Sequence, residues 1–191
     1  PHHHHIRRQP QMCIRDRYIT EKQLVENGPI LIDIDLRYNI DITERQHTND
    51  HIIDLIMLYS SKISKIFNIP NDTKINVFVM EKNNVNILED KTKDGIHIIF
   101  GISCHKAIQV LLREKIIREL GEMWEDLCLT NNFEDIIDLG VVKGFVNWQL
   151  YGSRKPGNKQ YILSHIYEIC YIRDENDWTI EEEDLNNFSI I

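Results

Sequence analysis

The sequence has few cysteines, and their spacing matches no metal or redox motif. Its four cysteines are far apart and form no Cys-x-x-Cys pair: Cys13, Cys104, Cys128 and Cys170. This spacing argues against a zinc ribbon and against a thioredoxin-like motif. A chain of 191 residues buries enough surface to be stable without disulfides. The cysteine pattern therefore fits a reducing compartment.

Long apolar runs and several catalytic motifs are also missing. No apolar stretch approaches the roughly 18 residues needed to span a bilayer, and no cleavable signal follows the N-terminal residues. There is no P-loop and no Gly-x-Ser-x-Gly elbow. His47 and His51 are four residues apart, but Thr48 replaces the glutamate of His-Glu-x-x-His, so we expect them to flank a helix start. We expect a cytoplasmic or nuclear protein that is not secreted and contacts no membrane.

Basic residues are scarce except in one window. Residues 1–17, with their histidine run, are interpreted as a non-native or disordered leader. That leader holds four of the 22 basic and one of the 30 acidic residues, so the rest has 18 basic and 29 acidic residues and a net charge of −11. Such a charge argues against coating nucleic acid by bulk attraction. Between Leu139 and Tyr167, however, there is no acidic residue, and four cations occur there: Lys143, Arg154, Lys155 and Lys159.

Hydrophobic periodicity predicts an α+β fold in a single domain. Asn49 or Asp50 is expected to cap a helix that stops before Pro70, and a second helix is expected at about 105–127. Strands are predicted at 30–36, 75–80, 85–88, 96–100, 147–151 and 161–169. We expect a catalytic domain at 18–180 and an acidic tail at 181–191.

Two carboxylates on the first predicted strand are candidates for chemistry. Because side chains alternate along a strand, Asp33 and Asp35 share one face while Ile32 and Ile34 share the other. Two like charges this close repel in a partly buried sheet unless a cation lies between them. Hard oxygen ligands suit Mg²⁺ or Mn²⁺. The alternative is that both acids lie at a strand end and pair with Arg37 or with solvent.

His97 and a later basic loop are the other candidates. His97 interrupts an apolar strand, where a lone histidine is more often a hydrogen-bonded core residue than a ligand. Residues 151–157 combine turn residues with Ser153, Arg154 and Lys155, a composition that suits phosphate binding or, alternatively, a solvated loop. Asp138 is either a third carboxylate of the same centre or the start of a turn.

Two tryptophans lie at apolar positions. Trp124 and Trp148 are both expected in the core. Because Trp148 is close to the basic loop in sequence, the alternative is that it stacks on a nucleic-acid base.

Taken together, these features resemble the three motifs of the archaeo-eukaryotic primase superfamily. The motifs are Asp33-Ile-Asp35, Gly95-Ile-His97, and Asp138 ahead of the basic loop. Segments 93–100 and 147–156 look like the primase domain of the primase-helicase replication proteins of nucleocytoplasmic large DNA viruses, such as pox-, irido- and mimiviruses. The resemblance spans about 29–167.

The resemblance implies an RRM-like antiparallel sheet plus an N-terminal α/β unit. It also implies a DNA-dependent nucleotidyltransferase, a DNA primase or primase-polymerase, that makes primers in viral-type replication. Asp33, Asp35 and Asp138, or Asp135 in place of Asp138, would be catalytic and hold two Mg²⁺ or Mn²⁺ ions. The incoming nucleotide would be bound by His97, Ser153, Arg154 and Lys155. Implied partners are a single-stranded DNA template, NTPs or dNTPs, and a helicase domain or other replication proteins.

Other functions stay open at this point. A chain that kept the fold without catalysis would be a single-stranded nucleic-acid-binding module of a replication protein. A glycosyltransferase would use Asp33 and Asp35 for a nucleotide sugar, which leaves His97 and the basic loop without a role. Such viral proteins continue into a superfamily III helicase, and without a P-loop the sequence leaves open whether it is a fragment or a free-standing primase domain.

Overall fold

The protein is built on one large antiparallel sheet. The computed structural model describes residues 18–155 and 157–187, so the predicted leader and residues 188–191 of the predicted tail lie outside the described part. The main strands pair in the order β2 (Gly28–Tyr38), β5 (Thr92–Cys104), β3 (Thr73–Glu81), β7 (Ile162–Ile172) and β8 (Asp177–Glu182), and β4 (Asn86–Ile87) pairs with β5. The predicted α+β class and antiparallel sheet are confirmed.

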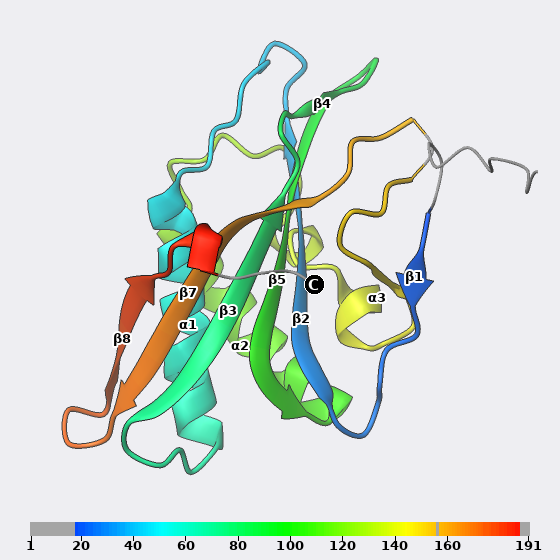
Figure 1. Ribbon diagram of the computed structural model, residues 1–191. Coiled ribbons are helices and arrows are strands. Elements are labelled where there is room, and N and C mark those ends of the chain that lie inside the picture. Colours follow the sequence, from blue (N-terminus) through cyan, green and yellow to red (C-terminus); the bar gives the residue numbers. More distant parts are fainter. Residues whose placement is uncertain (1–17, 156, 188–191) are drawn as a thin grey trace, which may run out of the picture.

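Two long helices cover one face of this sheet (Figure 1). Helix α1 (Asn49–Ile66) connects β2 to β3, and β5 inserts between these two strands, which makes a split βαβ unit. Helix α2 (Lys106–Met123) follows β5. Alternate residues of β2, including Ile32 and Ile34, are fully buried against the helices. The residues between them, including Asp33 and Asp35, therefore face the other side of the sheet.

The helix boundaries differ from the predicted ones in two places. Thr48 is the N-cap of α1, and its backbone N–H donates to His51 Nδ1 over 3.1 Å. The predicted cap at Asn49 or Asp50 is thus wrong by one or two residues, while the placement of His47 and His51 at a helix start is confirmed. Helix α2 ends at Met123 instead of residue 127, because Trp124 leaves helical geometry and is fully buried.

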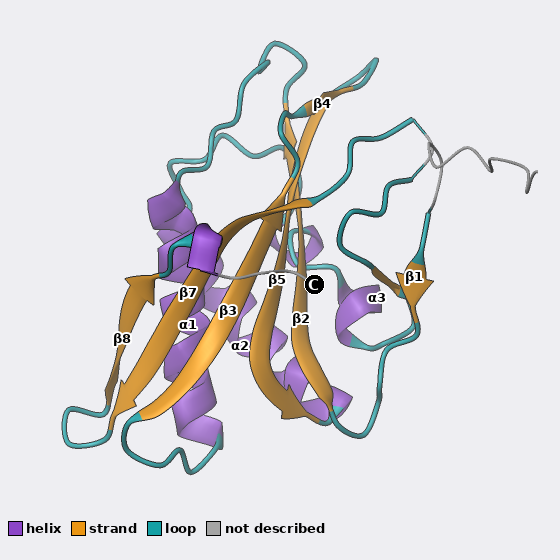
Figure 2. Cartoon of the chain, in the orientation of Figure 1, coloured by secondary structure: helices purple, strands orange, loops and turns teal. Residues whose placement is uncertain are grey.

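A second, smaller layer lies on the face that the long helices leave free (Figure 2). The predicted strand 147–151 contributes only β6 (Trp148–Gln149), which pairs with β1 (Thr20–Glu21). Residues 20–21, near the start of the described chain, therefore belong to this small sheet. The short helix α3 (Leu139–Val142) precedes β6. Five buried side chains hold this layer on the main sheet: Leu31, Met80, Val141, Trp148 and Tyr161.

The C-terminal strand belongs to the main sheet. Strand β8 pairs with β7, and Trp178 on it is 4% exposed and packs into the main core. The predicted boundary between domain and acidic tail, at 180/181, lies inside this strand. A 3₁₀ turn at Leu185–Asn187 follows. Within the described ranges, none of the helices has the length and apolar character to cross a membrane.

Candidate active site

A cleft of about 350 Å³ lies on the sheet face opposite the long helices. Asp33, Asp35 and Asp138 line it together with His97. Four lysines also line it: Lys82, Lys93, Lys155 and Lys159. The structure thus brings the three predicted acids, the predicted histidine and one of the predicted loop cations to a single cleft.

The third acid reaches the first through main-chain pairing. The backbone N–H of Asp138 donates to the Asp33 carbonyl over 2.9 Å, and Ile137 forms an isolated bridge with Ile34. Residues 136–138 therefore extend the free edge of β2. Asp138 Oδ1 caps α3 by accepting from the Val141 N–H over 2.9 Å. Asp135, the alternative third acid, lines a neighbouring hollow and not this cleft.

The first two motifs face each other across β2 and β5. Asp33 lies directly opposite His97, and Asp35 lies opposite Gly95. Asp33 Oδ1 is 3.4 Å from His97 Nε2. Asp35 Oδ2 is 3.1 Å from Lys93 Nζ and 3.8 Å from Arg37. The pairing with Arg37 that the sequence left open is thus present, beside a shorter one to Lys93.

Stacked rings hold the histidine. The His97 ring lies on Tyr161, with centroids 3.6 Å apart and planes 18° apart, and it also contacts Trp148 at 4.7 Å. Lys82 Nζ lies 4.7 Å from the centroid of the Tyr161 ring. His97 is 4% exposed, and its Nδ1 has no hydrogen-bond partner among the described residues. Packing therefore orients the imidazole and leaves Nε2 beside Asp33.

Gly95 makes room for this stack. A Cβ at position 95 would lie 2.5 Å from the hydroxyl oxygen of Tyr161 and 3.2 Å from the Ile34 carbonyl. Both distances are shorter than ordinary van der Waals contacts. Only a residue without a side chain lets Tyr161 lie over the start of this strand, which explains the glycine two residues before His97.

The acidic side chains match divalent ions in donor type. Asp33, Asp35 and Asp138 present carboxylate oxygens to one cleft, and such hard donors suit Mg²⁺ or Mn²⁺. Their side chains are not gathered tightly. Among the described residues, no three or more His, Cys, Asp or Glu side chains lie close enough together to hold a metal ion. In this structure Lys93 forms an ion pair with Asp35. Both side chains are partly exposed, and such pairs contribute little to stability.

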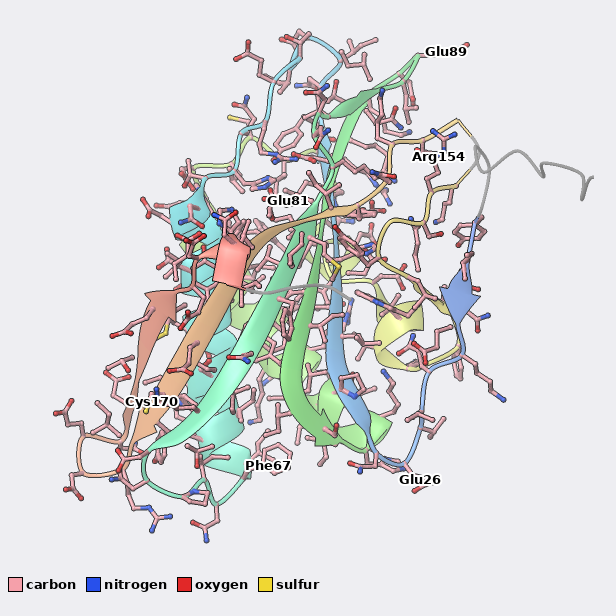
Figure 3. The ribbon with its side chains drawn as sticks, viewed as in Figure 1. Glu26, Phe67, Glu81, Glu89, Arg154 and Cys170 are labelled. Carbon is pink, nitrogen blue, oxygen red and sulfur yellow. The ribbon has the colours of Figure 1, made fainter. Side chains whose placement is uncertain are left out.

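The basic loop divides between the cleft and the fold. Lys155 lines the cleft, 5.9 Å from the ring centroid of Tyr18. Ser153, predicted to bind nucleotide, is buried, and its Oγ accepts from the Ile19 N–H over 2.7 Å. Arg154 lies on the loop beyond β6 and is not among the residues that line the cleft (Figure 3). Neither Ser153 nor Arg154 therefore lies with the three acids.

Two cleft lysines were missed by the sequence reasoning. Lys93 precedes Gly95 and His97 at alternate positions of β5, so strand periodicity could have found it. Lys82 follows the last residue of β3, where no spacing pattern singles out a lysine. Burial lowers the pKa of Lys82, while Asp35 partly opposes that shift. An anion in the cleft would favour its charged form.

A charged cluster supports the end of the sheet beside the cleft. It consists of Arg45, His47, Glu81, Asp94 and His165, of which His47, Glu81 and Asp94 are buried. Arg45 Nε lies 2.9 Å from Asp94, and Arg45 NH1 lies 2.9 Å from Glu81. His47 Nε2 lies 2.8 Å from Glu81, which Figure 3 marks near the end of β3. Asp94 also accepts from the Gly95 N–H over 2.9 Å. The cluster therefore fixes the strand that carries the Gly-x-His motif.

His165 should make stability depend on pH. The Glu81 carboxylate, 3.6 Å from Nε2, raises the pKa of His165, and Glu182 adds to the effect. Because the pKa is raised in the folded state, the stability that protonated His165 contributes is fully present below the ordinary histidine pKa of about 6.5. It is lost as the pH rises through the higher folded-state value. The difference in melting temperature between wild type and His165→Gln should be larger at pH 6 than at pH 9. An equal difference at both values would contradict this ionisation.

The fold and the cleft together define a class. A split βαβ sheet with two acids on its first strand, and a histidine directly opposite on the next, is the arrangement expected of a primase-type domain. Residues 11–167 match the family model described as "C962R protein N-terminal AEP domain", a match that begins inside the predicted leader. The chain belongs to this family, the archaeo-eukaryotic primases, as the motifs indicated.

A viral relative agrees with this assignment. Over 175 residues, 89% of this chain, the sequence is 32% identical to the protein named "Putative helicase L207/L206" of Acanthamoeba polyphaga mimivirus. The match covers 18% of that protein, so the chain spans less than a fifth of the relative's length. The family model and this relative confirm the resemblance to archaeo-eukaryotic primase domains of the viral primase-helicase type.

Proposed function

We propose that this domain is a DNA-dependent nucleotidyltransferase that makes primers on single-stranded DNA in viral-type replication. The observation that supports it most strongly is the shared cleft, which is lined by His97, by four lysines and by four carboxylates, those of Asp33, Asp35, Asp138 and Asp94. A cleft lined only by carboxylates would suit a cation, and a cleft lined only by lysines would suit an anion. A cleft lined by both suits a nucleoside triphosphate bound together with divalent ions.

In this proposal Asp33, Asp35 and Asp138 hold two Mg²⁺ or Mn²⁺ ions. Bound there, such ions activate a 3′-hydroxyl and neutralise the pyrophosphate leaving group. The remaining chemistry is positioning and charge neutralisation, on which phosphoryl transfer chiefly depends. The cleft lysines bind the triphosphate oxygens. His97, oriented by Tyr161, donates from Nε2 to one of them.

The implied partners follow from the same reaction. We propose that the domain takes NTPs or dNTPs and a single-stranded DNA template. The helicase name of the mimivirus relative supports a further proposal, that the domain acts together with a helicase domain or other replication proteins.

The direct test is template-dependent synthesis. The protein is mixed with a single-stranded template, NTPs or dNTPs, and Mg²⁺ or Mn²⁺, and the products are separated on a denaturing gel. We expect oligonucleotides that require template, nucleotide and metal. A protein that binds the template but forms no product under any of these conditions would instead be the nucleic-acid-binding module.

The two candidates for the third acid can be separated by a matched pair of variants. Asp138→Asn should reduce synthesis by more than about 100-fold, because loss of a metal ligand exceeds the 10- to 100-fold cost of disturbing a ligand's support. Asparagine still caps a helix, so α3 should persist. Asp135→Asn should leave the rate near that of wild type, since Asp135 lies outside the cleft. The reverse result would assign the role to Asp135.

A further inference from the structure

The loop at 143–147, between α3 and β6, presents an aromatic side chain to solvent. Phe145 is 83% exposed, the highest value among the large hydrophobic side chains described. The backbone around it is nevertheless well anchored. The N–H groups of Phe145 and Val146 both donate to the Gly140 carbonyl, over 2.9 and 3.2 Å. Gly144 takes a positive φ of 74°, which glycine adopts readily.

A glutamine and a buried lysine hold this loop through a chain of hydrogen bonds. Gln23 Nε2 donates to the Val146 carbonyl over 2.6 Å, and Lys106 Nζ donates in turn to Gln23 Oε1. Lys106 is 4% exposed, and a Cβ at Gly144 would lie 3.5 Å from its Cε atom. Side chains from two distant segments therefore hold the loop in place. An exposed ring on a fixed backbone loses little freedom when it binds a partner.

The surroundings of Phe145 indicate the chemistry of that partner. Val146 and Asn147, which follow it, line the active-site cleft, as does Asp138 before it. Lys143 is exposed in the same loop, and Lys155 and Lys159 also line the cleft. No acidic residue occurs between Leu139 and Tyr167 in a chain that is otherwise strongly acidic. The segment that carries Phe145 would thus attract a polyanion more than the acidic remainder of the chain does.

Trp148 cannot serve as the stacking residue that the sequence left open. It is 5% exposed and packs on His97 inside the small core. Its ring faces are therefore used within the protein. Phe145, three residues earlier, has the free ring face that Trp148 lacks.

We propose that Phe145 is a stacking platform for an unpaired base of the template strand, with Lys143 binding an adjacent phosphate. Exposed aromatics beside cations are the combination that binds single-stranded nucleic acid. This inference rests on the proposed function in naming the strand as the template. It requires binding only, so it can be tested without synthesis.

The test is the affinity for a labelled oligothymidylate, measured by fluorescence anisotropy without divalent metal. Phe145→Ala should weaken binding about tenfold, within the range measured for base–aromatic stacking, and Phe145→Trp should restore it. Leu111→Ala, at a residue 40% exposed on α2, is the matched control and should bind as wild type does. Lys143→Ala should reduce the dependence of log affinity on log salt concentration by about one unit.

An abasic strand of equal length separates stacking from other effects. Wild type and Phe145→Ala should bind it equally, because it keeps the phosphates and lacks the bases. The inference is overturned if Phe145→Ala binds oligothymidylate as tightly as wild type, or loses as much affinity for the abasic strand. A change in sedimentation behaviour with unchanged DNA affinity would make Phe145 a protein contact instead. Base-dependent binding by a protein that makes no primers would leave this inference standing and reject the enzyme.

Discussion

Asp33→Asn should abolish primer synthesis, with a loss of more than about 100-fold in rate, while the protein stays folded. Asp33 carries one of the four carboxylates that line the cleft and lies directly opposite His97. Asparagine has nearly the same shape but no charge, so it is a poor ligand for Mg²⁺ or Mn²⁺. The Asp33 side chain is 27% exposed, and asparagine keeps the Oδ1 atom that lies 3.4 Å from His97 Nε2, so the free energy of unfolding should change by on the order of 1 kcal/mol or less.

The control for this variant is a carboxylate far from the cleft. Asp54, exposed on α1 on the other side of the sheet, offers the same substitution. Asp54→Asn should leave both synthesis and melting temperature close to wild type. Single-turnover rates and thermal melts of the three proteins make the comparison. A rate for Asp33→Asn that matches Asp54→Asn would exclude Asp33 from catalysis, and a large fall in melting temperature would make its role structural.

Arg45→Met should lower the free energy of unfolding by about 3 to 5 kcal/mol, a larger loss of stability than we expect for any other variant proposed here. Arg45 binds Asp94 and Glu81, whose side chains are 0% and 7% exposed. Without the guanidinium, the two buried carboxylates keep histidines as their only ion-pair partners among the described residues, so their charges are poorly compensated. Urea unfolding followed by circular dichroism measures the change.

An exposed ion pair provides the matched control. Lys74 pairs with Glu168, and its side chain is 63% exposed. Lys74→Met should therefore lower the free energy of unfolding far less than Arg45→Met does. Equal losses in the free energy of unfolding for Lys74→Met and Arg45→Met would show that the charged cluster around Arg45 contributes no more to stability than a surface ion pair does.

The effect of Arg45→Met should also depend on pH. Burial alone would raise the pKa of Glu81, but its contacts with His165, His47 and Arg45 lower it well below the usual range. A lowered pKa gives stability that is present above the unfolded value of about 4.3 and is lost as the pH falls. Removing Arg45 removes part of that stability. The gap between wild type and variant should therefore narrow as the pH falls below about 4.

The sequence by itself determined the fold class and the central motifs. Alternation along 30–36 placed Asp33 and Asp35 on one strand face, and apolar periodicity located both long helices. These patterns are readable because strand and helix periods act on neighbouring residues. The motif spacing was specific enough to identify the primase family, which the family model confirms.

Only the tertiary structure decided which groups meet. Asp138 reaches Asp33 because residues 136–138 pair with the edge of β2, a contact between segments about a hundred residues apart. Lys82 lines the cleft with its Nζ 4.7 Å from the centroid of the Tyr161 ring, a contact between residues far apart in the sequence. Ser153, by contrast, turns inward to Ile19. Local patterns carry no information on such contacts, since strand pairing and packing between distant segments set them, and these depend on the whole chain.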